Sequence, residues 1–249
     1  MSRVTRVILI DLLVERSEFG HGGNQEVIQP IAERNTVEVL LVTPQMQSEQ
    51  AGFRAQEEGL VGISENDVPN WDYDYPFWEE WMSGGGALMR CSSRMGIPTL
   101  GICFGHQLLC HSLGATVERA ESMSSGVWDL SLNSHGSSDE LFSSRGSGEG
   151  GAPVALYSHQ DHVMDVPESC LLLGSAEHNR VTAVRVIGDD GMGLPAWGVQ
   201  FHPEAAKARV ERAFDWGHIS EEEMVAFQRE HDGAGVLNSF ASVVHANID

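Results

Sequence analysis

One cysteine in this sequence stands where a nucleophile would be placed. Cys103 follows the apolar run Ile97–Ile102, and glycines lie two positions to either side of it, at Gly101 and Gly105. This G-x-C-x-G spacing is the thiol counterpart of the nucleophile elbow, in which a strand turns sharply into a helix. Glycines suit such a strained turn because neighbouring backbone passes close by. The spacing predicts a reactive cysteine. A buried structural cysteine with two incidental glycines would give the same sequence pattern.

The position of Cys103 at the start of a helix adds two chemical features. Unpaired N–H groups and the positive end of the helix dipole favour the thiolate over the thiol. The same groups can donate hydrogen bonds to an oxyanion, and the amide of Phe104 is the first candidate. Together these features are those of a covalent catalyst.

A second segment supplies an acid/base group and a residue to orient it. The apolar run Trp197–Phe201 is followed by His202, Pro203 and Glu204. Parallel sheets collect their active groups at the carboxyl ends of strands, which is where this run would place His202. Proline suits the first turn of a helix, and Glu204 is near enough to accept a hydrogen bond from the imidazole. Taken alone, the three residues also fit an ordinary helix start with an acidic first turn.

The elements that would position these residues alternate between strand and helix over the first half of the chain. Expected strands are Arg6–Leu13, Val37–Thr43, Gly59–Ile63 and Ile97–Ile102, and expected helices are Asn24–Arg34, Phe77–Met89 and Phe104–Leu113. Pro30 should weaken the first helix, and Gly114 should end the last. This alternation predicts an α/β fold with a doubly wound, mostly parallel sheet.

The second half of the chain changes character. Short apolar runs separated by gaps too short for crossover helices predict an added antiparallel portion. They are Val127–Leu132, Val154–Tyr157, Leu171–Leu173, Val181–Val186 and Trp197–Phe201. Helices are expected at Glu204–Trp216, Glu221–Glu230 and Gly235–Ala246, so we expect one domain over residues 1–249 with a helical extension from about residue 204.

Composition narrows the possible partners. The 249 residues carry 15 basic and 36 acidic side chains, a formal net charge of −21. With a single lysine and 14 arginines, nucleic-acid binding and attraction to anionic membranes are not expected. No apolar run is long enough to span a bilayer, and the first apolar run reads as a strand and not as a signal peptide. Four cysteines without a paired spacing suggest reduced thiols and a cytoplasmic protein.

Four residues of metal-ligand type raise the alternative of a metal site. His159, Asp161, His162 and His202 are ligand types, but their order matches none of the usual metal-binding spacings. We therefore expect neither a metal nor another cofactor.

Three motifs together resemble those of the class I, or triad, glutamine amidotransferases. They are Gly101–Gln107, Tyr157–Val163 and Val199–Glu204, and they occur in the family's order. The resemblance covers roughly residues 37–205 and is nearest to stand-alone members similar to the glutaminase part of GMP synthetase. It implies a flavodoxin-like fold.

The resemblance also implies a reaction. Cys103 would attack the side-chain amide of glutamine and form a thioester, His202 would protonate the departing ammonia, and Glu204 would orient the imidazole. Gln107, Ser158 and His159 would line the pocket for the amino-acid end of glutamine. The ammonia would pass to an acceptor, possibly a synthetase subunit, and the oligomeric state is left open.

The sequence departs from the family at the loop after the third strand. The family has a glycine-rich loop there that completes the oxyanion hole, whereas this chain has Gly62–Asp67 with Ser64 and Glu65 in the middle. Backbone amides of Ser64 and Glu65 are the expected donors. This departure keeps open the alternative of a non-catalytic regulatory member of the fold. A hydrolase of other γ-glutamyl compounds on the same fold is the second alternative, although Gln107 after the elbow favours glutamine.

Overall fold

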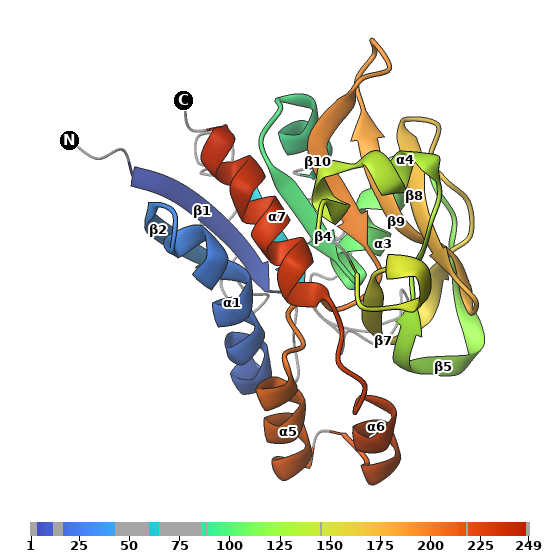
Figure 1. Ribbon diagram of the computed structural model, residues 1–249. Helices are drawn as coiled ribbons and strands as arrows, with labels where there is room; N and C mark the ends of the chain where they lie inside the picture. Colours follow the sequence, from blue (N-terminus) through green and yellow to red (C-terminus); the bar gives the residue numbers. More distant parts are fainter. Residues whose placement is uncertain are drawn as a thin grey trace.

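Figure 1 presents the computed structural model of the chain, coloured from the N-terminus to the C-terminus. The structure describes residues 4–11, 17–42, 60–64, 86–87, 89–144, 146–217 and 219–247. Most of the expected helix Phe77–Met89 and the residue Glu65 lie outside these ranges. Residues 86–87 and 89–94 are helical and precede the strand that leads to Cys103.

Five parallel strands form one half of the main sheet, in the order β2-β1-β3-β4-β10. Their bounds are Val4–Asp11 for β1, Thr36–Val42 for β2, Leu60–Ser64 for β3, Thr99–Ile102 for β4 and Gly193–Val199 for β10. The four strands expected in the first hundred residues are confirmed, with ends shifted by one or two residues. The mostly parallel sheet of an α/β protein is therefore present.

The strand β1 shows why these runs become interior strands. Successive side chains point to opposite faces of a sheet. Val7 and Leu9 accordingly belong to one buried cluster, and Ile8 and Ile10 belong to the other. A continuous apolar run is therefore buried on both faces, as expected for a parallel strand covered by helices on each side.

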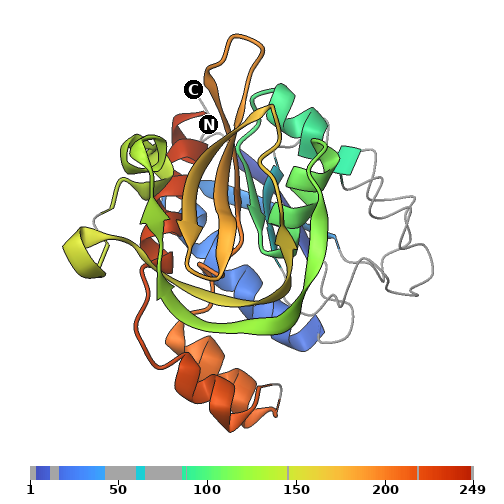
Figure 2. The same cartoon turned by 90° about the vertical axis from the view of Figure 1, so that its right-hand side faces the viewer.

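The other half of the sheet is antiparallel, in the order β10-β9-β8-β6. The bounds are Asn179–Ile187 for β9, Cys170–Ala176 for β8 and Ser131–Leu132 for β6. A separate antiparallel ribbon pairs β5, Val117–Asp129, with β7, Val154–Val163. In Figure 2 this strongly curved ribbon passes in front of the main sheet. The added antiparallel portion is confirmed.

The strand β5 begins ten residues before the expected Val127. Most of its first half is exposed, so it lacks the apolar alternation from which a strand can be read. Its register comes instead from pairing with β7, which a single sequence does not reveal.

Helices cover both faces of the sheet. The helices α1, Ser17–Ala32, and α7, Gly233–Ala246, pack together on one face, while α3, Phe104–Ser112, packs on the other (Figures 1 and 2). The shorter helical elements are α4 at Ser134–Ser138, α5 at Lys207–Asp215, α6 at Glu221–Ala226, and 3₁₀ turns at Glu140–Phe142 and Glu149–Gly151. Among the described residues, no helix combines the length and apolar character needed to cross a membrane.

The start of α1 and the end of α3 can be compared with the ends expected from the sequence. The helix α1 begins earlier than the expected Asn24 and tolerates Pro30 in its last turn. The helix α3 ends at Ser112, and Gly114 follows with a φ of 101°, the left-handed conformation expected for a glycine beyond a helix.

Candidate active site

Cys103 occupies the turn between β4 and α3. Its φ of 48° and ψ of −101° make it the one non-glycine residue with positive φ in the described part of the chain. Such a conformation is strained and persists only where the surroundings enforce it. Here the Cys103 N–H donates to the carbonyl of Val199 at 2.8 Å, and the Cys103 carbonyl accepts from the amide of Gln107 at 3.1 Å. Bonds on both sides thus hold the turn.

Gly101 is required by this turn. A Cβ at Gly101 would lie 2.6 Å from the carbonyl oxygen of Gly105 and 3.0 Å from the amide nitrogen of His106. Both are backbone atoms, so they cannot rotate away as a flexible side chain would. The spacing that predicted the elbow therefore has a steric cause in the fold.

The neighbouring strand delivers His202 to the same place. The strand β10 runs parallel to β4, with Gly198 opposite Gly101 and Val199 opposite Ile102. Three residues beyond the end of β10, the amide of His202 donates to the carbonyl of Leu156 in β7 at 2.8 Å. The two motifs therefore meet because their strands are adjacent.

The chain after His202 turns before it becomes helical. The amide of Ala205 donates to the carbonyl of His202 at 3.2 Å, and the amide of Ala206 donates to the carbonyl of Glu204 at 2.8 Å. The helix α5 starts only at Lys207, so the expected helix start at Glu204, directly after Pro203, is wrong. The turn brings Glu204 back towards the imidazole.

His202 and Glu204 form a buried ion pair. Nδ1 of His202 lies 2.8 Å from Oε1 of Glu204, and both side chains are inaccessible to solvent. Burial alone would lower the pKa of His202, but the charges of Glu204 and Cys103 reverse this effect and raise it to about 10. Burial also opposes the charge of Glu204, yet His202 and Arg209 lower its pKa to about 2. The pair is therefore imidazolium and carboxylate at neutral pH.

Cys103 and His202 are neighbours in the site. The charge of the Cys103 sulfur is one of the influences that raise the pKa of His202. Nε2 of His202 is buried and forms no hydrogen bond among the described residues.

Gln200 also contacts the cysteine, and the sequence reasoning missed it. Its Nε2 donates to the Cys103 sulfur at 3.5 Å, and its Oε1 accepts from Nε2 of Gln107 at 3.2 Å. Nε2 of Gln107 also donates to the carbonyl of Asp161 at 2.8 Å. The amide nitrogen of Gln107 is thus engaged within the protein. A polar residue inside the apolar run that ends at Phe201 was the signal that could have revealed Gln200.

Two of the expected oxyanion residues, Phe104 and Ser64, lie at the same edge of the sheet. Phe104 opens α3 directly after Cys103. Ser64 is the last residue of β3, and its neighbour Ile63 pairs with Gly101 in β4. Ser64, expected in the loop just after the strand Gly59–Ile63, is therefore the last residue of that strand.

Ser158 and His159 lie in β7. Nδ1 of His159 bonds to the carbonyl of Asp161 at 3.1 Å, and burial followed by the nearby His162 lowers the pKa of His159 well below its ordinary value. The rings of His162 and His178 lie 4.8 and 5.6 Å from that of His159. Within the described residues, no group of three or more ligand-type side chains is arranged to hold a metal ion.

Comparison with known families agrees with this geometry. The model of the family described as glutamine amidotransferase class-I matches residues 83–214, which include both the elbow and the His202–Glu204 pair. The matched stretch is more than half of the chain. The protein therefore belongs to the class-I glutamine amidotransferase family.

Individual relatives place the chain more closely. It is 30% identical over 188 residues to the glutamine-hydrolyzing GMP synthase of Clostridium kluyveri, a match that covers 75% of this chain and 32% of that protein. The chain thus spans about a third of the length of this curated relative. The fold is similar to that of a glutamine amidotransferase of Thermotoga maritima, with a TM-score of 0.66 and 20% identity over 97% of this chain and 98% of that one. A glutamine amido transferase of Methylobacillus flagellatus gives a TM-score of 0.65 at 20% identity, over 98% and 94% of the two chains.

The elbow geometry predicts a steric cost at Gly101. Gly101→Ala should lower the free energy of unfolding by roughly 1–3 kcal/mol, the usual cost of overpacking, measured by urea denaturation. The control is Gly235→Ala in α7, where the nearest atom to a new Cβ is in the side chain of Ser144 at 3.2 Å. The control should leave stability unchanged or raise it by up to about 1 kcal/mol. Equal effects of the two substitutions would contradict the steric account.

The ion pair predicts the titration of one histidine ring. In nuclear magnetic resonance titrations, His202 should stay protonated well above neutral pH. Glu204→Gln should lower the pKa of His202, because burial then acts with less opposing charge. Glu211→Gln, an exposed change on α5, serves as the control and should have no effect. An unchanged His202 pKa in Glu204→Gln would show that the pair does not set the charge of the imidazole.

Proposed function

We propose that this protein is a glutamine amidotransferase that hydrolyses the side-chain amide of glutamine and releases ammonia for an acceptor. Cys103 is the nucleophile, His202 the general acid and base, and Glu204 the residue that orients the imidazole. The carrying observation is the meeting of a strained cysteine at a helix start with a buried His202–Glu204 ion pair in the chain that follows the adjacent strand. Family membership supports the choice of substrate.

The first half of the reaction uses the imidazolium. The Cys103 thiolate attacks the amide carbon of glutamine, and a carbon–sulfur bond forms as the carbonyl oxygen becomes an oxyanion. His202 then gives a proton to the amide nitrogen, the carbon–nitrogen bond breaks, and ammonia leaves. A γ-glutamyl thioester on Cys103 and a neutral His202 remain.

The second half restores the resting state. His202, now neutral, takes a proton from a water molecule that attacks the thioester carbon. The carbon–sulfur bond breaks, glutamate departs, and the thiolate and imidazolium form again. Glu204 remains ionised throughout, because the charges of His202 and Arg209 lower its pKa to about 2. Every step uses side chains and water alone, so no cofactor is proposed.

The proposed oxyanion donors and glutamine contacts are assigned from the positions of their residues next to Cys103. The amide of Phe104 at the start of α3 and the amides of Ser64 and Glu65 at the end of β3 are the proposed donors to the oxyanion. Ser158 and His159 in β7 are proposed to contact the amino-acid end of glutamine. Gln107 would support that pocket through its bonds to Gln200 and Asp161.

The acceptor of ammonia is proposed to be a synthetase active site supplied by another subunit or another part of a longer protein. The support is the similarity to glutamine-hydrolyzing GMP synthase, of which this chain matches about a third. A cytoplasmic location, without nucleic-acid or membrane contacts, fits the net charge of −21 and the four cysteines, none of which forms a disulfide in the described structure.

The nucleophile can be tested by substitution. Cys103→Ala should abolish ammonia release from glutamine, because no other group can form the thioester, while the circular dichroism spectrum stays that of the wild type. The control is Cys91→Ala, which changes a partly exposed thiol remote from the elbow in sequence and should retain full activity. Ammonia release by Cys103→Ala at the wild-type rate would contradict the proposal.

Substrate class is tested in the same assay. Glutamine should be hydrolysed faster than γ-glutamyl amines, and the reverse order would favour the alternative hydrolase. A glutamine analogue with an electrophile in place of the amide should alkylate Cys103 and leave Cys91 unmodified. Absence of both turnover and alkylation would favour a regulatory, non-catalytic member of the family.

The raised pKa of His202 sets the alkaline limit of activity. Because the protonated ring is the active form in the first step, kcat/KM should hold through neutral pH and fall only as pH rises towards about 10. Glu204→Gln lowers that pKa and should move the alkaline limb to lower pH. A profile that is measured with glutamine and falls near pH 6.5 in the wild type would contradict this assignment.

A further inference from the structure

Arg209, in the helix α5, is buried beside the proposed triad. Only 2% of its surface is exposed, and its Nη1 donates to Oε1 of Glu204 at 2.9 Å. The same oxygen bonds Nδ1 of His202 at 2.8 Å. One carboxylate oxygen is therefore held between two positively charged donors. The burial of Arg209 has no signal in the sequence, because an arginine in a charged helix usually belongs to a solvated face.

The helix α1 is shaped to receive the guanidinium. A Cβ at Gly23 would lie 2.4 Å from Nη1 of Arg209 and 2.7 Å from its Cζ. The guanidinium thus packs directly against the backbone of α1. A buried charge is tolerated only when it is paired, and Glu204 supplies that pairing.

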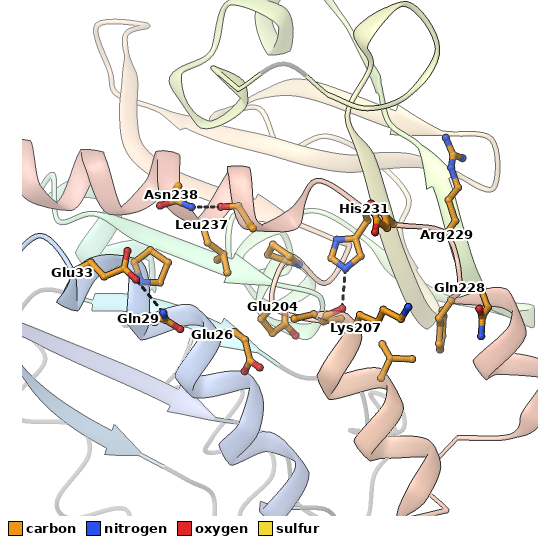
Figure 3. A pocket seen from close by; sticks show the side chains of 18 residues that line it. Glu26, Gln29, Glu33, Glu204, Lys207, Gln228, Arg229, His231, Leu237 and Asn238 are labelled. Carbon is orange, nitrogen blue, oxygen red and sulfur yellow. Dashed lines mark hydrogen bonds between the residues drawn. The ribbon is translucent and has the colours of Figure 1, made fainter.

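We call the bond from Arg209 to Glu204, with the guanidinium packed against Gly23, the clamp. The surroundings of Glu204 show why this clamp matters. Glu204 lines a pocket of about 450 Å³ between α1, α5 and α7, with Glu26 of α1 on the same wall (Figure 3). Oε2 of Glu204 is buried and forms no hydrogen bond within the described residues. Among the described residues, Oε1 alone carries the hydrogen bonds of the Glu204 carboxylate, one with His202 and one from Arg209. The bond from Arg209 therefore helps to fix the orientation of the carboxylate against the imidazole.

The charge of Arg209 also favours the ionised form of Glu204. Among the described residues, His202 and Arg209 act on the charge of Glu204, and the charge of Glu204 acts in turn on Glu26. Burial would raise the pKa of Glu204, and the charge of Arg209 is one of the influences that lower it. A protonated Glu204 could not stabilise the imidazolium, so the guanidinium preserves the ion pair as well as its geometry.

We propose that Arg209 is a positioning residue of the active site, which acts through Glu204 to hold His202 in its reactive orientation. The catalytic consequence rests on the function proposed above, whereas the clamp on Glu204 does not. The competing interpretation is a structural link between α5 and α1 with no effect on the triad. The two differ in what happens to Glu204 when the guanidinium is removed.

The first experiment measures Glu204 directly and needs no activity. In carbon-detected magnetic resonance titrations of the glutamate carboxyl groups, Arg209→Met should raise the pKa of Glu204 from its low value. Arg212→Met removes the same charge from the same helix, where the side chain lies over the Trp216 ring, and should leave Glu204 unchanged. No change in Arg209→Met, or equal changes in both variants, would overturn the proposal.

The second experiment measures glutamine hydrolysis. Arg209→Met should lower kcat roughly tenfold to a hundredfold, the cost of a slightly misplaced catalytic group, with KM unchanged because Arg209 does not reach the substrate. Arg209→Lys, which keeps the charge, should recover part of the loss. In the Glu204→Gln background the same substitution should cost little more, since the residue through which Arg209 acts is already altered. Additive losses would overturn the proposal.

A variant on a different helix covers the possibility that Arg209→Met does not fold. Gly23→Ala places a methyl group against the guanidinium and should reproduce both effects, a raised Glu204 pKa and a lower kcat. A folded Gly23→Ala with a wild-type Glu204 titration would count against the clamp. If the wild type itself hydrolyses no glutamine while Arg209→Met still shifts Glu204, the proposed function fails and the clamp stands.

Discussion

The carboxylate of Glu204 is cut off from water and lies between two cations, and the arrangement of the site depends on it. A buried charge is unfavourable unless it is paired, so neither His202 nor Arg209 can leave it without a large cost. Each partner comes from a different segment, His202 from the chain that follows β10 and Arg209 from α5. The ion pairs therefore fix the turn between these segments and present the imidazole to Cys103.

The strained cysteine is held by the same part of the fold. Its amide bonds to Val199 at the end of β10, the strand that also leads to His202. The proposed nucleophile and base are thus positioned through one pair of parallel strands, and the glycine at position 101 lets α3 start against them. Strain at the cysteine and charge at Glu204 are features that the fold tolerates at a functional site and would not favour elsewhere.

The sequence predicted the parts of the site that carry a local signature. Cys103, with its flanking glycines, and His202 with Glu204 are recognisable from spacing, and the structure brings them together. Arg209 and Gln200 have no such signature, because their burial depends on Gly23 and Gln107, which are distant in the chain. The parallel strands were predictable from apolar runs, whereas the polar strand β5 is defined by its pairing with β7. Glu65 lies outside the described residues and stays a prediction.

The central claim is a covalent γ-glutamyl intermediate on the cysteine of the elbow. The protein can be mixed with glutamine, quenched in acid within the first turnovers and digested, and the peptides examined by mass spectrometry. The account predicts a γ-glutamyl adduct on the peptide that contains Cys103, lost on treatment with hydroxylamine, and on no other cysteine peptide. Glutamine hydrolysis without an adduct at Cys103, or an adduct on a different cysteine, would contradict it.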